Sequence, residues 1–421
     1  MIAPLIAFRN IFRHKTRSLI TLSTIVFGCV ALIFAGGFFE DVYFKMRESY
    51  IKSYTGHIQI FKKGFLEHGR TQPYNFLIDD YEKICREVES IKTVKFITPR
   101  FEFSGLVSTG ENTISFMGMG VETKNEKANN EITNNLRQSS NNLTVGGVVM
   151  LSGEQFKESE TYSITLGKGL AQAIGAKTGD GLVLLTNTVN GSVNALDVNV
   201  KGIFYTSSKA FDDHFMRMNL KTSQKLLGTN AVQSLVVMLN DTSNTKITLN
   251  LLKQKFSSQG FDLELRSWEE VSDFYNQTVT LFNRLFLILK IVITIIVILS
   301  IFNTMNMAVF ERISEIGTIM ALGTKQSGVI SLFMYEGLFL GILGGTIGLF
   351  AGGIVTTIIS SIGIPMPPPP GATMMWLSEP KLIPSMFVFS FTLSVLTSII
   401  STVYPAYTAS RLEIADALRN K

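Results

Sequence analysis

Long apolar runs and one long polar stretch divide this chain, and their lengths predict helices that cross a membrane. The apolar runs occupy residues 19–40, 281–310, 328–362 and 382–409. A helix needs about 20 residues to cross the hydrocarbon core of a bilayer, and each run reaches that length. The pattern therefore predicts four transmembrane helices, one near the N-terminus and three in the last third of the chain.

A cleaved secretory signal is the alternative for the first run, because basic residues precede it. Signal cores are shorter, at about 7–15 residues, and they end in a small-x-small cleavage site. This run ends instead in Ala35-Gly36-Gly37-Phe38-Phe39, which is a poor site. We therefore expect a retained anchor.

The polar stretch at residues 41–280 alternates between strand and helix patterns, as a water-exposed domain does. A strand, a helix and a second strand follow one another at residues 57–61, 79–91 and 94–97, and again at 234–239, 247–256 and 261–265. Alternate apolar residues mark the strand at 57–61, and apolar residues three or four apart mark the helix at 79–91. We expect these two units to form one α/β subdomain around a β-rich insert at residues 105–230, in which residues 124–147 form a polar loop.

The predicted fold is thus a membrane α-helical protein with a large α+β extracytoplasmic domain inserted between the first and second spans. The connections to the membrane also have helical patterns. Ser267-Trp268-Glu269-Glu270 fits a capping box that opens a helix running into the second span, and residues 42–51 continue the first span outward. Such connections either couple the outer domain to the membrane or form a structural neck, and the sequence leaves both open.

Charge sets the predicted orientation. The first 18 positions hold no acidic residue and four basic ones, Arg9, Arg13, Lys15 and Arg17. Because short cytoplasmic segments are rich in Lys and Arg, we expect segments 1–18, 311–327 and 410–421 inside the cell and the loop 363–381 outside. The chain is then a multi-pass protein of the bacterial inner membrane with a periplasmic domain. Its net charge of +5 is mild, so membrane lipids but no nucleic acid are expected as partners.

Two charged residues fall within or near the spans. Lys290 lies near the outer end of the second span, where a snorkelling position at the interface is the leading interpretation. Glu336 lies about two turns into the third span. A carboxylate inside the membrane is a functional candidate by default, and a hydrogen bond to a neighbouring helix is an equal alternative.

Glycines in the third span repeat in register. Gly344, Gly348 and Gly352 are four residues apart, so they line one helix face. Small residues on such a face let helix backbones approach closely in lipid, which predicts a packing surface. Its partner is either another span of this chain or a second subunit.

No pattern for catalysis or metal binding stands out. The sequence has no H-E-x-x-H and no G-x-S-x-G, and Asp212-Asp213-His214 is interpreted as a solvated turn. Cys29 and Cys85 lie in unlike environments, so no disulfide is expected between them. The stiff run Pro365–Pro370 is interpreted as a spacer, with partner binding as the alternative.

The sequence also lacks a phosphate-binding loop. No G-x-x-x-x-G-K-[ST] occurs, and the nearest approach, Gly175-Ala176-Lys177-Thr178, lacks the glycine next to the lysine. We therefore expect no catalytic, cofactor or metal site in this chain. Any ATP and Mg²⁺ belong to a partner.

Four segments together resemble one family of membrane proteins. They are Ala7–Arg17, Glu311–Lys325, Phe333–Gly337 and Tyr404–Arg419. They are similar to the corresponding segments of ABC transporter permeases of the MacB, LolC/LolE and FtsX group, and the layout of one span, a large outer domain and three spans matches throughout. The resemblance implies a dimer with a second copy or a paralogue, and a cytoplasmic pair of ABC ATPase subunits.

In this family the segment that matches residues 311–327 is a coupling helix that docks on the ATPase. The candidate coupling residues are Glu311, Arg312, Glu315, Ile316, Gly317, Ile319, Met320 and Gly323. Ile316, Ile319 and Met320 belong to an apolar stripe, which an ATPase groove would accept. Contact with the bilayer surface is the alternative for the stripe, and the resemblance favours docking.

The expected function is that of a permease subunit that couples ATP hydrolysis by the partner to movement of its periplasmic domain. The absence of a fused ATPase favours lipoprotein release, as in LolC/LolE, with a periplasmic carrier. The alternatives are MacB-like efflux of small molecules or peptides with a periplasmic adaptor, FtsX-like signalling to a periplasmic enzyme, and a membrane-anchored receptor or scaffold that transports nothing.

Overall fold

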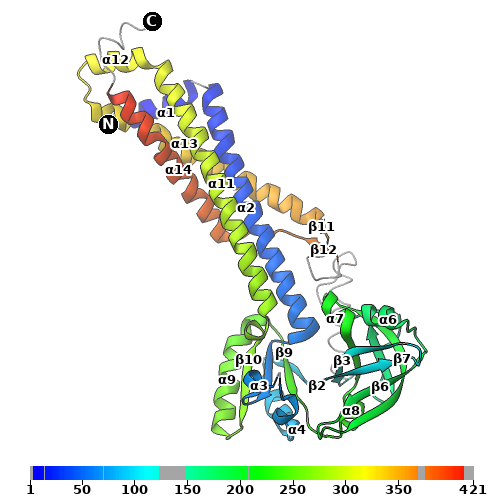
Figure 1. The fold of residues 1–421 in the computed structure, drawn as a ribbon. Helices are drawn as coiled ribbons and strands as arrows, with labels where there is room; N and C mark the ends of the chain where they lie inside the picture. The colour runs from blue at the N-terminus through cyan, green and yellow to red at the C-terminus, as the bar shows by residue number, and fades with distance from the viewer. Residues whose placement is uncertain are drawn as a thin grey trace. The chain divides into compact units, whose positions relative to one another are not determined.

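The computed structural model describes residues 3–13, 15–69, 71–122, 148–206, 208–367 and 375–411 (Figure 1). The chain forms two compact units. The helical unit comprises Met1–Tyr43, Val279–Ile364 and Ser378–Lys421, and the sheet unit comprises Phe44–Thr278 and Pro365–Leu377. The predicted polar loop at 124–147 and most of the proline run lie outside the described residues.

Four described helices are long and apolar enough to cross a membrane, as predicted. They are α2 (Lys15–Tyr50), α11 (Asp273–Glu311), α13 (Gln326–Ile362) and α14 (Pro384–Ser410). Two shorter helices, α1 (Ala3–Arg13) and α12 (Ile313–Ala321), complete the helical unit. Because α2 and α11 include polar continuations, they are longer than the apolar runs that predicted them.

The predicted continuation of the first span is confirmed. A helix starts after Ser267 as predicted, but it does not run unbroken into the second span. Helix α2 runs to Tyr50, where the π-helical turn η1 (Ile51–Thr55) follows. At the other connection, α10 (Trp268–Val271) ends at Ser272, whose ψ of 64° is not helical. The Ser267 hydroxyl donates to the Glu270 carboxylate and caps no backbone N–H, so the capping box does not form.

The sheet unit is built on a ten-stranded mixed sheet. Its strands are β1 (Ile58–Lys62), β2 (Val94–Ser108), β3 (Thr113–Val121), β4 (Val149–Gly153), β5 (Ser163–Gly167), β6 (Gly181–Asn187), β7 (Val193–Tyr205), β8 (Phe215–Asn219), β9 (Ser234–Leu239) and β10 (Leu263–Ser267). The strand order is β10-β1-β9-β2-β3-β8-β5-β7-β4, and β6 pairs with β2 and β7. All six residues of β9 are buried, which explains its unbroken apolar sequence.

Short helices and turns connect these strands. They are α3 (Phe65–His68), η2 (Pro73–Phe76), α4 (Tyr81–Glu89), α6 (Lys168–Ile174), α7 (Lys209–His214), α8 (Leu220–Leu227), η3 (Thr242–Asn244) and α9 (Thr245–Ser258). The predicted pair of strand-helix-strand units is confirmed, because β10, β1, β9 and β2 are neighbours in one sheet. Helices α4 and α9 bury part of their apolar residues, including Ile84, Val88 and Leu252, while Ile247 stays exposed.

Beyond the sheet, β11 (Ile364–Met366) and β12 (Trp376–Ser378) form a separate two-stranded ribbon. Both cysteines are free thiols, Cys29 buried in the helical unit and Cys85 partly buried in the sheet unit. The expectation that they form no disulfide is therefore confirmed.

Candidate coupling site

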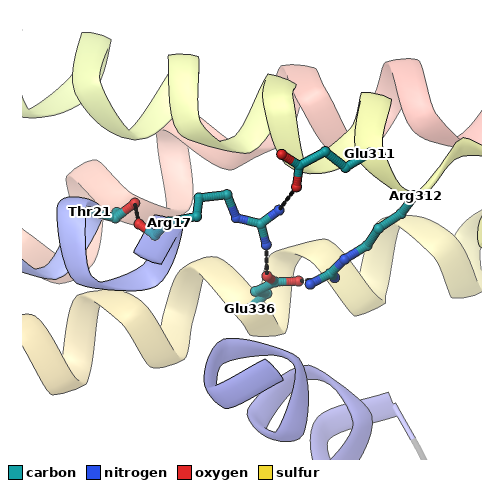
Figure 2. A network of polar contacts seen from close by, with 5 residues as sticks. All are labelled: Arg17, Thr21, Glu311, Arg312 and Glu336. Carbon is teal, nitrogen blue, oxygen red and sulfur yellow. Dashed lines mark hydrogen bonds and ion pairs between the residues drawn. The ribbon is translucent and has the colours of Figure 1, made fainter. Parts of the chain in front are cut away.

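Glu336 lies at the centre of an ion network in the helical unit (Figure 2). One carboxylate oxygen accepts from Arg17 Nη2 at 3.1 Å, and the other accepts from Arg312 Nη1 at 3.1 Å. Arg17 also reaches Glu311 through Nη1 at 3.5 Å. The network therefore joins the first turn of α2, the end of α11 and the second turn of the apolar part of α13.

The chemistry of the network depends on its burial. The Glu336 side chain is 1% exposed and that of Arg312 is 5% exposed. A buried carboxylate is stable only when it is paired and hydrogen-bonded, and here each oxygen has its own guanidinium donor. Sequence analysis left Glu336 open between a functional residue and one that bonds to a neighbouring helix. The structure shows that it bonds to two other elements at once.

Arg312 is buried because of its backbone. It lies between α11 and α12 with φ −113° and ψ 14°, so the chain turns there and the side chain points inward. Its Nε and Nη2 atoms have no hydrogen-bond partner in the described part of the chain. Arg312, a candidate coupling residue, is therefore buried within the helical unit.

Ile316 also faces inward. It is 4% exposed and packs in one cluster with Val309, Phe333 and Ala406, while Met320 is partly buried against the same cluster. Helix α12 therefore uses part of its apolar stripe to hold itself against α11, α13 and α14. Ile316 and Gly317, both candidate coupling residues, are buried in the helical unit.

The outer face of α12 is smaller than predicted but still apolar. Ile319 is 38% exposed, and Leu322, just after the helix, is 83% exposed. Glu315 is exposed and forms an ion pair of 3.0 Å with Arg13 of α1. Gly323 has a φ of 94°, a left-handed conformation that favours glycine, and it turns the chain toward α13.

Two rows of glycine on α13 hold the long helices together. A Cβ on Gly344, Gly348 or Gly352 would lie 2.8, 2.6 and 2.8 Å from Ile25, Cys29 and Ile33 of α2. The structure thus places the predicted glycine face against another span of this chain. Sequence analysis missed the second row, which has the same spacing and faces Thr402, Ser398 and Ser394 of α14: Gly337, Gly341 and Gly345.

Arg17 is the main residue of the network that sequence analysis missed. It was interpreted only as part of the basic N-terminal cluster. The available signal was a mismatch: Glu336 is an acidic residue inside an apolar run and has no basic residue within one turn of its own helix.

Two family models match the chain. The model of the FtsX-like permease C-terminal domain matches residues 287–414, which hold the second part of α11 and all of α12, α13 and α14. The model of the MacB-like periplasmic core domain matches residues 18–255. Together the two matches extend over nearly the whole chain.

Three relatives illustrate the range of similar proteins. An uncharacterized ABC transporter permease of Methanocaldococcus jannaschii is 23% identical over 99% of this chain and 97% of its own length. The lipoprotein-releasing system transmembrane protein LolC of Xylella fastidiosa is 25% identical, over 61% of this chain and 65% of its own length. The macrolide export ATP-binding/permease protein MacB of Bordetella avium is 22% identical, over 68% of this chain and 45% of its own length.

Proposed function

Because this chain belongs to the family of ABC transporter permeases that carry a MacB-like periplasmic core domain and an FtsX-like permease domain, we propose that it couples a cytoplasmic ATPase to movement of its sheet unit. Membership of this family implies an ATPase partner. In the proposed complex that partner is a separate chain, which binds ATP and Mg²⁺, and α12 is the segment on which it docks.

The observation that carries this proposal is the exposed apolar tip of α12. Ile319 and Leu322 project from a helix whose opposite face is buried, so the tip is available while the helix stays fixed. A docked partner would bury both side chains in an apolar groove, as amphipathic helices commonly do. The Arg312–Glu336 pair then passes a displacement of α12 to α13, since the buried carboxylate must keep its donors.

Transmission beyond the network follows from the continuity of two helices. Helix α2 runs unbroken from Lys15 to Tyr50, and α11 runs unbroken from Asp273 to Glu311. Arg17 near the start of α2 and Glu311 at the end of α11 both belong to the network. In the proposed mechanism, ATP-driven movement of the partner therefore reaches both helices at the same point.

Docking is tested by changing the tip without touching the network. We expect the double substitution Ile319→Asp and Leu322→Asp to abolish co-purification of the ATPase with tagged permease, because two charges would be buried in an apolar groove. Ser327→Asp is the matched control, an exposed position in the first turn of α13 that should retain the ATPase. Retention of the ATPase by the double variant would overturn the docking role.

The cargo is proposed to be a lipoprotein, with a dimer of two permeases as the functional unit. Support comes from the relative named as a lipoprotein-releasing system protein, which matches this chain over 61% of its residues. The relative named as a macrolide exporter supports the second candidate, the efflux of small molecules.

The two cargo candidates predict different stimulation of ATPase activity. Permease and ATPase reconstituted in proteoliposomes should hydrolyse ATP faster when a synthetic triacylated lipopeptide is present. The same peptide without acyl chains is the control. Stimulation by a macrolide and not by the lipopeptide would reverse the assignment.

A further inference from the structure

Lys290 on α11 is held between two aromatic rings of the helical unit. Its Nζ lies 4.2 Å from the ring centroid of Phe286 on the same helix and 4.9 Å from that of Phe389 on α14. Aromatic faces attract a cation but do not neutralise its charge. Among the residues that the structure describes, no carboxylate forms an ion pair with this ammonium group.

The position of Lys290 along the helix places it at a membrane boundary. Glu311, in the ion network, lies about 31 Å further along α11, at about 1.5 Å per residue. The hydrocarbon core of a bilayer is about 30 Å thick. Phe389 lies about 33 Å from Arg411 at the end of α14 by the same measure. If the ion network marks one face of the hydrocarbon core, the ammonium group lies at the level of the phosphates on the other face.

Side chains around this level fit an interfacial position. Phe39 of α2 packs on Phe286, with ring centroids 5.0 Å apart, and the Tyr43 hydroxyl donates to Asn283 at 3.0 Å. Aromatic residues gather at membrane interfaces, where an apolar body and a polar tip are both accommodated. Lys290 is therefore a cation in the headgroup layer, with rings on two sides and its remaining donors open.

A narrow apolar crevice begins one turn further along α11. It lies between α2, α11 and α14, and its lining includes Gly28, Ile293, Val297, Ser390 and Leu393. Gly28 keeps the crevice open, since a Cβ there would lie 3.0 Å from Val297. The surface that lines it is almost entirely apolar. Its free volume is about 10 Å³, room for about one water molecule, so the acyl chains of a lipid bound at Lys290 would stay in the surrounding bilayer.

We propose that Lys290 binds an anionic membrane phospholipid, with the phosphate at the ammonium group and the acyl chains in the surrounding bilayer. The charge of the headgroup complements a cation that has no ion pair in the described residues, and hydrogen bonds between two ions are the stronger kind. The site concerns a resident lipid, so it stands whether or not the chain transports a lipoprotein.

The test is lipid binding by the purified full-length chain in detergent, measured by native mass spectrometry. Phosphatidylglycerol and phosphatidylcholine with identical acyl chains are the probes. We expect the wild type to bind phosphatidylglycerol more tightly, and Lys290→Gln to weaken that binding about tenfold, the size expected for one charge-assisted hydrogen bond. Lys290→Arg keeps the charge and should restore binding to within about threefold of the wild type, because a guanidinium also pairs with phosphate.

Arg284→Gln is the matched control. Arg284 is an exposed cation on the same helix for which the structure gives no aromatic clamp, so its loss should leave the affinity unchanged. The site would be overturned if Lys290→Gln bound phosphatidylglycerol as tightly as the wild type, or if Arg284→Gln lost as much affinity as Lys290→Gln. Equal affinities of the wild type for phosphatidylglycerol and phosphatidylcholine would also overturn it.

Discussion

At the scale of single residues, the Glu336 network depends on every member being present. Two guanidinium groups share one carboxylate that is 1% exposed, so removal of the negative charge leaves the buried Arg312 without an ion pair among the described residues and Arg17 with Glu311 alone. Breaking a buried pair on one side costs far more than the pair itself contributes. The network is therefore a sensitive point for both stability and coupling.

We expect Glu336→Gln to destabilise the helical unit by about 3–5 kcal/mol, the usual cost of an uncompensated buried charge. Thermal unfolding in detergent would measure the change. Glu315→Gln is the matched control, because the Arg13–Glu315 pair is 63% and 47% exposed and such pairs contribute at most about 1 kcal/mol. Similar losses in the two variants would show that the burial of Glu336 has no energetic role.

His57 gives a prediction of pH dependence in the sheet unit. It is buried, its Nδ1 accepts from the Leu239 N–H at 3.1 Å, and its Nε2 lies 3.1 Å from the Thr242 hydroxyl. The neutral ring with the proton on Nε2 satisfies both contacts. Burial is the main reason that the pKa of His57 falls from 6.5 to about 4.

The sign follows from proton binding. Between pH 6.5 and about 4 the unfolded chain binds a proton at His57 that the folded domain does not. The contribution of His57 to the free energy of unfolding is therefore complete above pH 6.5. It is lost on acidification, by about 3 kcal/mol at most. Unfolding followed by fluorescence of Trp268, whose buried cluster also includes Met238, should show this loss. In His57→Gln the free energy of unfolding should fall less on acidification, by that same amount. An unchanged dependence on pH would contradict the assignment.

Sequence alone identified some of these residues and not their partners. Glu336 stood out because burying a carboxylate is costly, and the apolar run around it is visible in the neighbouring sequence. Its partner Arg17 is 319 positions away, so only tertiary packing brings them together. Ile316 shows the same limit, because an amphipathic pattern shows that a face is apolar and does not show whether the chain itself or a partner covers it.

At the scale of elements, α13 is the helix around which the others pack. One row of its glycines touches α2 and the other touches α14, so a side chain on either row would force the backbones apart. Close backbone approach is a main source of helix association in lipid, where no hydrophobic force draws helices together. The two rows thus hold α2, α13 and α14 as one body.

Two glycines of α13 offer a matched comparison. A Cβ at Gly348 would lie 2.6 Å from the Cβ of Cys29, whereas one at Gly353 would lie 3.6 Å from the nearest atom of Phe387. We expect Gly348→Ala to destabilise the helical unit by about 1–3 kcal/mol, as overpacking does, and Gly353→Ala to be tolerated. Melting temperatures in detergent would compare them. Equal melting temperatures would mean that α2 moves aside without cost.

Elements were predicted well where a pattern is long and poorly where it is short. The four spans and strand β9 follow from continuous runs of apolar residues. The capping box at Ser267 rests on four residues, and there Ser267 bonds to Glu270 and the helix breaks at Ser272. Local side-chain competition of this kind leaves no signal in the sequence pattern.

At the scale of the whole molecule, the proposed orientation puts the sheet unit outside the cytoplasm and α12 inside it. In a variant without native cysteines (Cys29→Ser and Cys85→Ser), a membrane-impermeant maleimide should label Asn190→Cys in intact cells. Asn190 is exposed in the turn between β6 and β7. Gln326→Cys, exposed at the start of α13, should be labelled only after lysis. The reverse pattern would invert the orientation and remove the basis for ATPase docking.

The pairing of β1 with β10 limits how this domain can be moved. The chain enters the sheet unit through α2, η1 and β1 and leaves it through β10, α10 and α11, and Ile58 lies opposite Ser267 in the antiparallel register. A force that pulled the two connections apart would act on one β1–β10 residue pair at a time. It would separate the strands at low force, beginning with Ile58 and Ser267. A force that pushed both connections in the same direction would instead be shared by all the residue pairs of β1 and β10. The sheet unit is therefore suited to being moved as one rigid body. A working stroke that separated α2 from α11 would break the β1–β10 pairing, starting at Ile58 and Ser267.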